Sequence, residues 1–291
     1  METIINESPV TGSMLSLSDV ETLADSGFYW REKKGVKVLV CRPLSEAGFT
    51  NGFSTRLGGV SPFPAGDLNL SGFDEDSSEN IYENRQRFLK VFDGDFVLST
   101  VWQVHGDAIR LIKTKDEAND TDQKFDGVVA NIPNLLVGVK TADCVPILLG
   151  DPRTGAFAAV HAGWRGTAKS IAAQAVRSMR KEFGTQPKDL ICAIGPAACG
   201  RNYEIGKDVI DVFETNFADT GKYFTATRTG HALVDLHAAN RDQAIAAGVD
   251  VENISVAPLC TMERTDLFFS YRIEKKTLGK TGRLLSVIGR S

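Results

Sequence analysis

Apolar and polar residues along this chain form alternating strand-like and helix-like blocks. Residues 36–41 and 50–55 have the short apolar pattern of strands, and the second block leads into a glycine-rich loop at residues 56–62. Residues 78–92 then predict an amphipathic helix, with Ser77 or Ser78 as its N-cap. Its apolar residues lie 7, 8 and 11 positions apart on one face: Ile81, Phe88, Leu89 and Phe92.

Two extended runs follow, at residues 97–104 and 108–112. The short segment His105-Gly-Asp107 separates them. We therefore expect a β-hairpin with His105 near its tip, which is a natural place for a ligand-binding side chain.

Residues 135–149 and 156–161 are apolar segments typical of buried strands. Pro146 interrupts the first segment. Because proline cannot donate to a sheet ladder, the chain is expected to bend right after Cys144 and to expose that thiol at a strand discontinuity. His161 ends the next strand, so Cys144 and His161 are expected at neighbouring strand ends.

The C-terminal half continues the mixed pattern of helices and strands. A helix from Thr167 is predicted to end at Gly184, because apolar residues recur every four positions between them. A second helix is expected around residues 209–217, and a third is capped by Asp235 and runs to Gly248. Residues 254–257 resume as a strand.

Length and charge set the class of protein. The chain has 291 residues and no visible linker, so one domain is favoured over two. A net charge of −4 without a basic run argues against nucleic acid or an anionic membrane surface as a partner. The N-terminus lacks the pattern of a signal peptide, and no stretch is long and apolar enough for a membrane span, so we expect a cytoplasmic protein. An odd number of cysteines, five, favours reduced thiols over a disulfide framework.

The candidate chemistry lies in His105, Cys144 and His161. Two imidazoles and one thiolate are the donor set of a zinc ion with one open coordination position, the usual arrangement of catalytic zinc. Asp143 and Arg165 place charges beside two of these residues, where an inert strand end would not need them. Gly163 and Gly166 would allow a ligand to approach the backbone closely.

The remaining histidines and cysteines lack such surroundings. His231 and His237 are expected to be solvent-facing, and the other cysteines are expected to be small buried hydrophobic residues: Cys41, Cys192, Cys199 and Cys260. The zincin, dinucleotide-binding, P-loop and zinc-deaminase motifs are all missing from the sequence.

Several longer motifs make the sequence recognisable. From about residue 36 to the C-terminus the chain resembles the YfiH-like family, once described as laccase-domain proteins or polyphenol oxidases. The motifs that carry the resemblance occur in the order Thr55-Arg-Leu-Gly-Gly59, Gln103-Val-His105-Gly, Thr141-Ala-Asp-Cys144-Val-Pro, His161-Ala-Gly-Trp-Arg-Gly166, Gly195-Pro196, Tyr203-Glu-Ile-Gly206, Phe268-Phe-Ser-Tyr-Arg272 and Thr281-Gly-Arg283. Asn202 departs from the pattern, since family members usually carry cysteine there, and this argues against a metal role at that position.

The resemblance implies a fold and an activity. The fold would be a mixed α+β structure of the cysteine-hydrolase type, with α/β/β/α layers and mixed sheets. A single catalytic domain would span residues 36–291, preceded in the sequence by an N-terminal extension at residues 1–35. The activity would be phosphorolysis of adenosine, inosine and S-methyl-5′-thioadenosine, with some adenosine deamination. Purine nucleosides and phosphate would then be the partners of a monomer or small homo-oligomer.

The resemblance also assigns the catalytic or metal-binding residues to His105, Cys144 and His161. The metal would be zinc, with copper as the alternative, and whether catalysis requires it is left open. For deamination, zinc would activate a water molecule for attack on the purine C6, and Asp143 could shuttle the proton.

The phosphate needs a cationic site. Arg56, on the loop that contains Gly58 and Gly59, is the first candidate, because a guanidinium and free backbone amides form an anion cradle. Arg165 and Arg272 are further candidates.

Two other enzyme classes remain open. Without metal, His161 could lower the pKa of Cys144 and give a thiolate for a Cys/His amidohydrolase acting on peptidoglycan precursors. With copper, the two histidines and the cysteine are also the donor set of a blue-copper site, which would suit a laccase-like polyphenol oxidase. A non-catalytic binding module is disfavoured, because reactive side chains at strand ends are costly to keep unless they are used.

Overall fold

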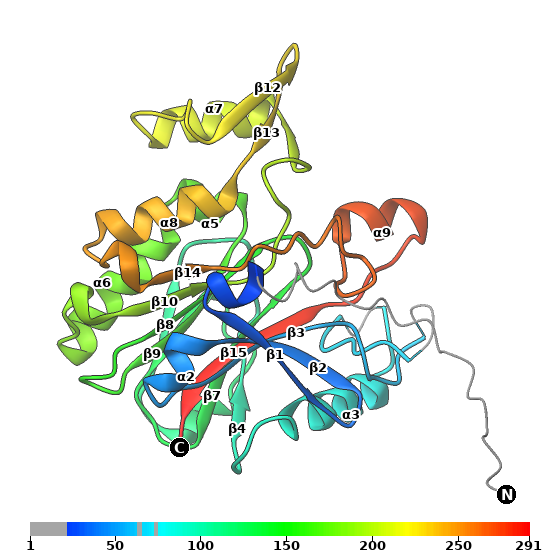
Figure 1. Cartoon of the computed structure of the whole chain (residues 1–291), viewed down its shortest axis with the longest axis vertical. Helices are drawn as coiled ribbons and strands as arrows, with labels where there is room; N and C mark the ends of the chain where they lie inside the picture. Colours follow the sequence, from blue (N-terminus) through cyan, green and yellow to red (C-terminus); the bar gives the residue numbers. More distant parts are fainter. Residues whose placement is uncertain (1–21, 63–65, 73–74) are drawn as a thin grey trace, which may run out of the picture.

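The computed structural model describes residues 22–62, 66–72 and 75–291, and two large sheets form its centre (Figure 1). The first sheet has the strand order β1-β2-β3-β15-β7-β4. Its strands are β1 (Phe28–Lys33), β2 (Val36–Cys41), β3 (Thr50–Ser54), β15 (Leu284–Arg290), β7 (Leu135–Thr141) and β4 (Val97–Ser99). The second sheet has the order β14-β10-β8-β9-β6-β5. Its strands are β14 (Ile254–Val256), β10 (Ile191–Ile194), β8 (Val145–Gly150), β9 (Phe157–Ala162), β6 (Gly127–Ala130) and β5 (Ile109–Ile112).

Strand residues alternate between two different apolar cores. In β2, Val38 packs towards the helix α3 (Ser78–Leu89), whereas Leu39 packs into the core between the two sheets. In β9, Phe157 enters the same central core, whereas Val160 faces the helices on the other side. The alternation follows from the two-residue period of a strand, and it buries both faces of each sheet.

Helices cover the two outer faces and complete the layers. On the second sheet these are α5 (Trp164–Ala168), α6 (Ile171–Phe183) and α8 (Leu236–Ala246), which share one apolar core with β8 and β9. The order helix, sheet, sheet, helix confirms the predicted α/β/β/α architecture. The shorter helices are α2 (Arg42–Glu46), α4 (Lys115–Ala118) and α9 (Tyr271–Thr277), with 3-10 turns at Pro187–Asp189 and Val251–Asn253.

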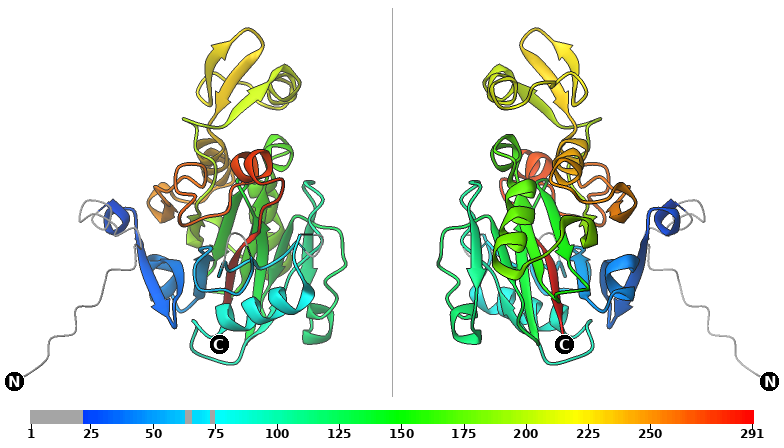
Figure 2. Two further views of the ribbon diagram at one scale, coloured as in Figure 1. Left: turned by 90° about the vertical axis from the view of Figure 1, so that its right-hand side faces the viewer. Right: turned by 90° about the vertical axis from the view of Figure 1, so that its left-hand side faces the viewer.

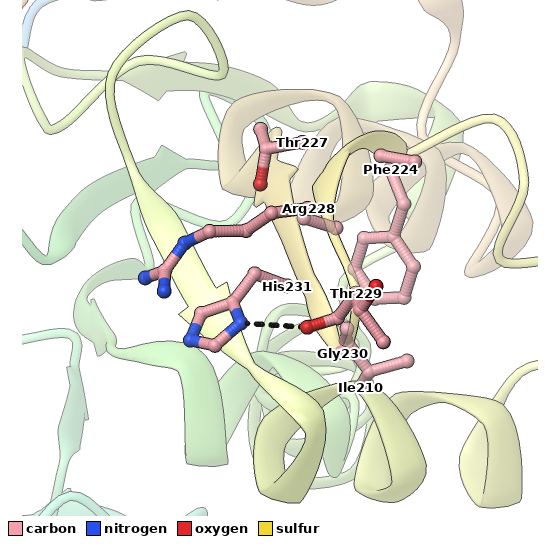
Figure 3. Close-up of a pocket in the computed structure, with 9 residues that line it drawn as sticks. Ile210, Phe224, Thr227, Arg228, Thr229, Gly230 and His231 are labelled. Atoms are coloured by element: carbon pink, nitrogen blue, oxygen red, sulfur yellow. Dashed lines mark hydrogen bonds between the residues drawn. The ribbon is translucent and has the colours of Figure 1, made fainter.

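A small lobe stands away from the sheets at the top of Figure 1, and Figure 2 shows the same separation from the side. It contains α7 (Lys207–Asn216) and a three-stranded sheet of order β11-β13-β12. Those strands are β11 (Glu204–Gly206), β13 (His231–Val234) and β12 (Phe224–Arg228). A shallow hollow on this lobe is lined by Ile210, Phe224 and His231, whose Nδ1 lies 3.2 Å from the carbonyl oxygen of Thr229 (Figure 3).

Several local predictions are confirmed by the helix ends. Ser77 caps α3 by accepting a hydrogen bond from the Asn80 amide, and Asp235 caps α8 in the same way from Ala238. Gly184 ends α6 in the left-handed conformation. The predicted helix from Thr167 is divided, however, because Ser170 also adopts a left-handed conformation between α5 and α6.

The predicted hairpin around His105 is wrong. β4 pairs in parallel with β7 of the first sheet, whereas β5 pairs in parallel with β6 of the second sheet. The segment that contains His105 therefore crosses from one sheet to the other. Alternation along two short runs predicts their strand character but does not say with which strand each one pairs.

The prediction at Pro146 is correct only in part. Cys144 does lie at a strand discontinuity, between β7 of the first sheet and β8 of the second. Pro146 lies inside β8, in register with His161, so the chain changes sheet before the proline.

Two further observations concern the limits of the folded body. β1 pairs along its whole length with β2, so the first sheet includes residues N-terminal to position 36. Among the described residues, the helices are all too short or too polar to cross a membrane.

Candidate functional site

His105, Cys144 and His161 meet where the chain passes between the two sheets. His105 comes from the segment between β4 and β5, Cys144 follows β7, and His161 lies in β9. Their ligand atoms all lie within 4.8 Å of one another. The imidazole rings meet edge to face, with centroids 4.9 Å apart. We call these three residues the His-Cys-His cluster; His161 is buried, Cys144 is half-buried and His105 is exposed, so the cluster opens to solvent on one side.

The carboxylate of Asp126 connects two members of this cluster. It lies 2.8 Å from Nδ1 of His161, and its two oxygens also accept hydrogen bonds from the backbone amides of Val104, His105 and Gly106. With Nδ1 engaged, Nε2 of His161 is the ring nitrogen left for Cys144 or a metal. Asp126 is fully buried, so these contacts also compensate the cost of burying its charge.

Two residues of the site adopt a strained backbone conformation. His105 has a φ of 58° and Asp143 has a φ of 83°, both in the left-handed region that non-glycine residues avoid. The Asp143 carboxylate is held by hydrogen bonds from the Thr261 hydroxyl at 2.7 Å, the Ser270 hydroxyl at 3.1 Å and the Arg272 amide at 2.7 Å. These contacts give Asp143 a positioning role for the turn that presents Cys144.

Two glycines of the His-Ala-Gly-Trp-Arg-Gly motif allow the cluster to close. A side chain at Gly163 would place its Cβ 3.2 Å from Sγ of Cys144 and 3.3 Å from Cδ2 of His105. At Gly166 the Cβ would lie 2.8 Å from the carbonyl oxygen of Gly106. The sequence predicted close approach at these glycines, but the approaching groups are the site's own residues.

The cluster favours a charged thiolate–imidazolium pair. Burial opposes ionisation of Cys144, but the charge and hydrogen bonds of His161 and His105 outweigh it and lower the thiol pKa to about 6. Burial likewise opposes protonation of His161, but Cys144 and Asp126 raise its pKa to about 9. Each partner therefore favours the charged form of the other.

The donor set fits a zinc ion. Two nitrogens and one sulfur with an open fourth position suit catalytic zinc, and a carboxylate on the second nitrogen of a ligating histidine is the usual support for such a ligand. Asp126 supplies that support to His161.

Arg56 is directed into a buried ion network. Its guanidinium forms two 2.9 Å hydrogen bonds with Asp67, a 2.6 Å hydrogen bond with Glu274, and a 2.8 Å hydrogen bond with the carbonyl of Thr265. The three residues are each at most 6% exposed. This network gives Arg56 a structural role, so its binding of phosphate stays a prediction.

The packing of the loop explains why positions 58 and 59 are glycine. A Cβ at Gly58 would lie 2.4 Å from the carbonyl oxygen of Gly35, and Gly58 has a φ of 87°. At Gly59 the Cβ would overlap the backbone of Asp67. Close packing of this loop therefore requires both glycines.

The other two predicted cations lie on segments that adjoin residues of the site. Arg165 is exposed and follows Gly163 by two positions in the sequence. The central carbon of its guanidinium lies 4.3 Å from the ring centroid of Trp164. Arg272 lies over the ring of Tyr203 at 4.8 Å and donates to the carbonyl of Glu204, while its own amide binds Asp143.

Two residues of this region were not predicted from the sequence. Asp126 directly precedes the buried strand β6, and a charge at that position was a detectable signal. Lys140 lies in the otherwise apolar strand β7, where burial and the nearby charge of Arg85 lower its pKa to about 8. Its Nζ donates to the carbonyl of Val101.

The other histidines and cysteines lie outside the His-Cys-His cluster. His237 is half-buried rather than solvent-facing, because its Nε2 lies 3.0 Å from the carbonyl oxygen of Gly195, and His231 is half-buried on the small lobe. The expectation of buried cysteines is confirmed for Cys41, Cys192 and Cys260. Cys199 differs, since it is partly exposed.

Comparison with known proteins identifies the family. The sequence model of the family described as multi-copper polyphenol oxidoreductase laccase matches residues 50–291. A purine nucleoside phosphorylase of Bacteroides thetaiotaomicron is 33% identical over 245 residues, which cover 81% of this chain and 89% of the relative. Purine nucleoside phosphorylase YlmD of Bacillus subtilis is 31% identical over 246 residues, 82% of this chain and 87% of the relative.

Solved structures agree with this assignment. The hypothetical protein YfiH of Bacillus licheniformis has a TM-score of 0.82 and 31% identity, and the match covers 91% of this chain and 99% of that protein. YlmD of Geobacillus stearothermophilus has a TM-score of 0.82 and 32% identity, with 91% and 98% covered. The chain therefore belongs to the YfiH-like, laccase-domain family, whose relatives include proteins named purine nucleoside phosphorylase.

Proposed function

We propose that this chain is a purine nucleoside phosphorylase. It would cleave adenosine, inosine and S-methyl-5′-thioadenosine with phosphate to the free base and the sugar 1-phosphate, and would also deaminate adenosine. The single observation that carries the proposal is the meeting of His105, Cys144 and His161 with Asp126 in a chain whose relatives are named purine nucleoside phosphorylases.

The cluster offers a proton donor for the departing purine. Phosphorolysis breaks the bond between the sugar C1′ and a base nitrogen, and the base leaves more easily when it is protonated. Cys144 and Asp126 raise the pKa of His161, which favours its charged form, and Asp126 fixes its orientation. In metal-free protein, Nε2 of His161 would give up that proton to the base. The hydrogen phosphate loses a proton as it forms the sugar 1-phosphate, and that proton would restore the imidazolium, which Cys144 and Asp126 stabilise.

Arg165 and Arg272 are the cations that we propose for the phosphate. Both are exposed, and each lies beside a segment that builds the His-Cys-His cluster. Guanidinium groups suit this role because they bind two phosphate oxygens at once. Arg56 would first have to leave Asp67 and Glu274, so we propose it as a support of the loop that contains Gly58 and Gly59.

His105, Cys144 and His161 would hold zinc if a metal takes part. The ion would supply a Lewis acid that polarises a substrate oxygen or a water molecule, as deamination at the purine C6 requires. Asp126 would orient His161 as a ligand, while Asp143 would hold the turn of Cys144 in place. Transfer of a proton by Asp143 itself stays a prediction.

A Cys/His amidohydrolase is the second candidate function. Cys144, His161 and Asp126 form a nucleophile, a base and an orienting carboxylate in hydrogen-bonded sequence, which is the arrangement of cysteine hydrolases. Amide bonds of peptidoglycan precursors would be the substrates. Phosphate dependence separates the two candidates, because only phosphorolysis consumes phosphate.

The description of the family as laccase favours a third candidate, copper-dependent oxidation of phenols. The cluster has the two nitrogens and one sulfur of a blue-copper site. The chain has only four histidines, however, and His231 and His237 lie elsewhere, so the further copper ions of a multicopper oxidase would lack ligands.

The first prediction tests phosphorolysis. Wild-type protein incubated with adenosine and phosphate is expected to release adenine and ribose 1-phosphate, measured by chromatography. Cys144→Ala is expected to lower the rate by about 10²- to 10⁴-fold, the range for loss of a positioned catalytic group. Cys41→Ala, which removes a buried thiol elsewhere, serves as the folded control. Absence of base release from every purine nucleoside tested would overturn the proposal.

The second prediction concerns the thiolate. In metal-stripped protein, alkylation of Cys144 by iodoacetamide is expected to rise with pH around a midpoint near 6, because the thiolate is the reactive form. In His161→Gln the midpoint should move up, since the cation that stabilises the thiolate is gone. Mass spectrometry of each cysteine gives the comparison, because burial raises the pKa of Cys41 to about 11. Equal pH profiles for Cys144 and Cys41 would contradict the thiolate–imidazolium pair.

The third prediction concerns copper. Protein loaded with copper is expected to remain without phenol oxidase activity. The reason is the shortage of histidine ligands beyond His105 and His161. A strong blue band together with turnover of phenols would establish the oxidase instead.

A further inference from the structure

A second group of potential metal ligands lies outside the His-Cys-His cluster. It consists of Cys199, Cys260 and Glu263, whose ligand atoms all lie within 4.8 Å of one another. We call it the Cys-Cys-Glu cluster. Cys260 is 3% exposed, Cys199 is half-buried and Glu263 is exposed, so the group is closed on one side and open to solvent on the other.

The three ligand atoms already surround an electropositive group. The side-chain nitrogen of Asn202 lies 2.8 Å from Oε1 of Glu263, 3.4 Å from Sγ of Cys199 and 3.8 Å from Sγ of Cys260. One amide group thus donates towards two sulfurs and a carboxylate at once. The acceptors converge on one point from three separate positions in the chain, as the ligands of a cation do.

Asn202 can become a ligand itself, although its departure from the family pattern argued against a metal role at this position. Rotation of its amide by half a turn exchanges the nitrogen and the oxygen, which have nearly the same shape. The cluster would then present two sulfurs and two oxygens, a four-donor set. Two thiolates with oxygen donors suit zinc, which binds both kinds of ligand in tetrahedral geometry.

The backbone that holds the two cysteines is fixed in place. Ala197 pairs with Cys260 in an isolated bridge, and the amide of Cys199 donates to Sγ of Cys260 at 3.3 Å. Asn202 and Tyr203 both donate from their backbone amides to the carbonyl of Cys199, closing a tight turn. The ligands therefore need little rearrangement to bind an ion.

The ion pair that competes for the carboxylate is exposed. Arg201 donates to both oxygens of Glu263, at 2.9 Å to Oε2 and at 3.1 and 3.3 Å to Oε1, but the Glu263 and Arg201 side chains are 41% and 75% exposed. Ion pairs at such exposed positions contribute little stability. One oxygen of Glu263 can therefore turn to a metal at small cost.

The cluster also adjoins the turn that presents Cys144. The amide of Ala198 donates to the carbonyl of Asp143, and the hydroxyl of Thr261 donates to the carboxylate of Asp143. Cys199 follows Ala198 and Cys260 precedes Thr261, so each cysteine is adjacent in sequence to a residue that hydrogen-bonds to Asp143. An ion bound between them would tie these two supports together.

We propose that Cys199, Cys260 and Glu263, with the side-chain oxygen of Asn202, form a second zinc site that stabilises the support of Asp143. The site is separate from the His-Cys-His cluster and does not depend on the proposed phosphorolysis. Zinc binding by the two cysteines would release their thiol protons.

Zinc stoichiometry tests the proposal directly. Full-length protein, kept reduced and metal-stripped, is loaded with zinc, dialysed and analysed by mass spectrometry of the metal. Cys144→Ala removes the thiolate of the other cluster, so any tight zinc left in that variant reports on the second site. We expect one zinc ion per chain in Cys144→Ala and none in Cys144→Ala/Cys199→Ser. Equal zinc content in these two variants would overturn the proposal.

Cobalt provides a readout that identifies the ligands. In Cys144→Ala, cobalt is expected to give a thiolate-to-metal charge-transfer band that Cys199→Ser removes and that Cys192→Ala, a thiol buried in the core, leaves in place. Glu263→Gln changes an exposed side chain, so this variant can still be tested if the cysteine variants fail to fold. Glu263→Gln should weaken cobalt binding, and Glu263→Asp should restore part of that binding. Formation of a disulfide between Cys199 and Cys260 without any charge-transfer band on cobalt addition would contradict the zinc site.

Discussion

The carboxylate of Asp126 is the interaction on which the rest of the site depends. It is buried without solvent contact and accepts hydrogen bonds from three successive backbone amides, those of residues 104–106. The same group fixes Nδ1 of His161. One side chain therefore holds the segment of His105 in its left-handed conformation and orients the second histidine. Without that charge, the two imidazoles would lose their common anchor.

The division of the chain between two sheets supplies the other half of the site. β7 belongs to one sheet and β8 to the other, and the short connection between them carries Cys144. Asp143, strained at a φ of 83°, is held by groups from the C-terminal part of the chain. The absence of a side chain at Gly163 lets the sulfur approach His105. The layered fold thus brings the thiol of Cys144 and the two imidazoles together next to solvent from segments that are far apart in sequence.

The sequence predicted most elements of the fold and the composition of the His-Cys-His cluster. Periodicity and capping residues were sufficient for β2, α3 and α8, because these signals are local. The pairing of β4 and β5 was not predictable in this way, since the two strands belong to different sheets. Donor chemistry selected His105, Cys144 and His161, but not Asp126, whose role appears only when β6 and β9 lie side by side.

The remaining differences have the same physical origin. The glycine-rich loop of Arg56 indicated a phosphate ligand. In the fold, however, Asp67 and Glu274 compensate the charge of Arg56, and Glu274 lies 218 positions away in the sequence. The sequence predicted Cys199 to be a small buried hydrophobic residue, whereas the structure brings its thiol close to Cys260 and Glu263. The residue type shows which chemistry a side chain can perform. Its role also depends on the residues that contact it in the fold, and these come from distant segments of the sequence.

The most direct test of this account is the kcat of adenosine phosphorolysis in Asp126→Asn, compared with wild type under conditions where circular dichroism shows both proteins folded. The substitution keeps the shape of the side chain but removes the charge that orients His161 and anchors the segment of His105. We expect a fall in kcat of about 10- to 100-fold, the usual effect of losing such a supporting carboxylate. A kcat equal to that of the wild type would contradict it.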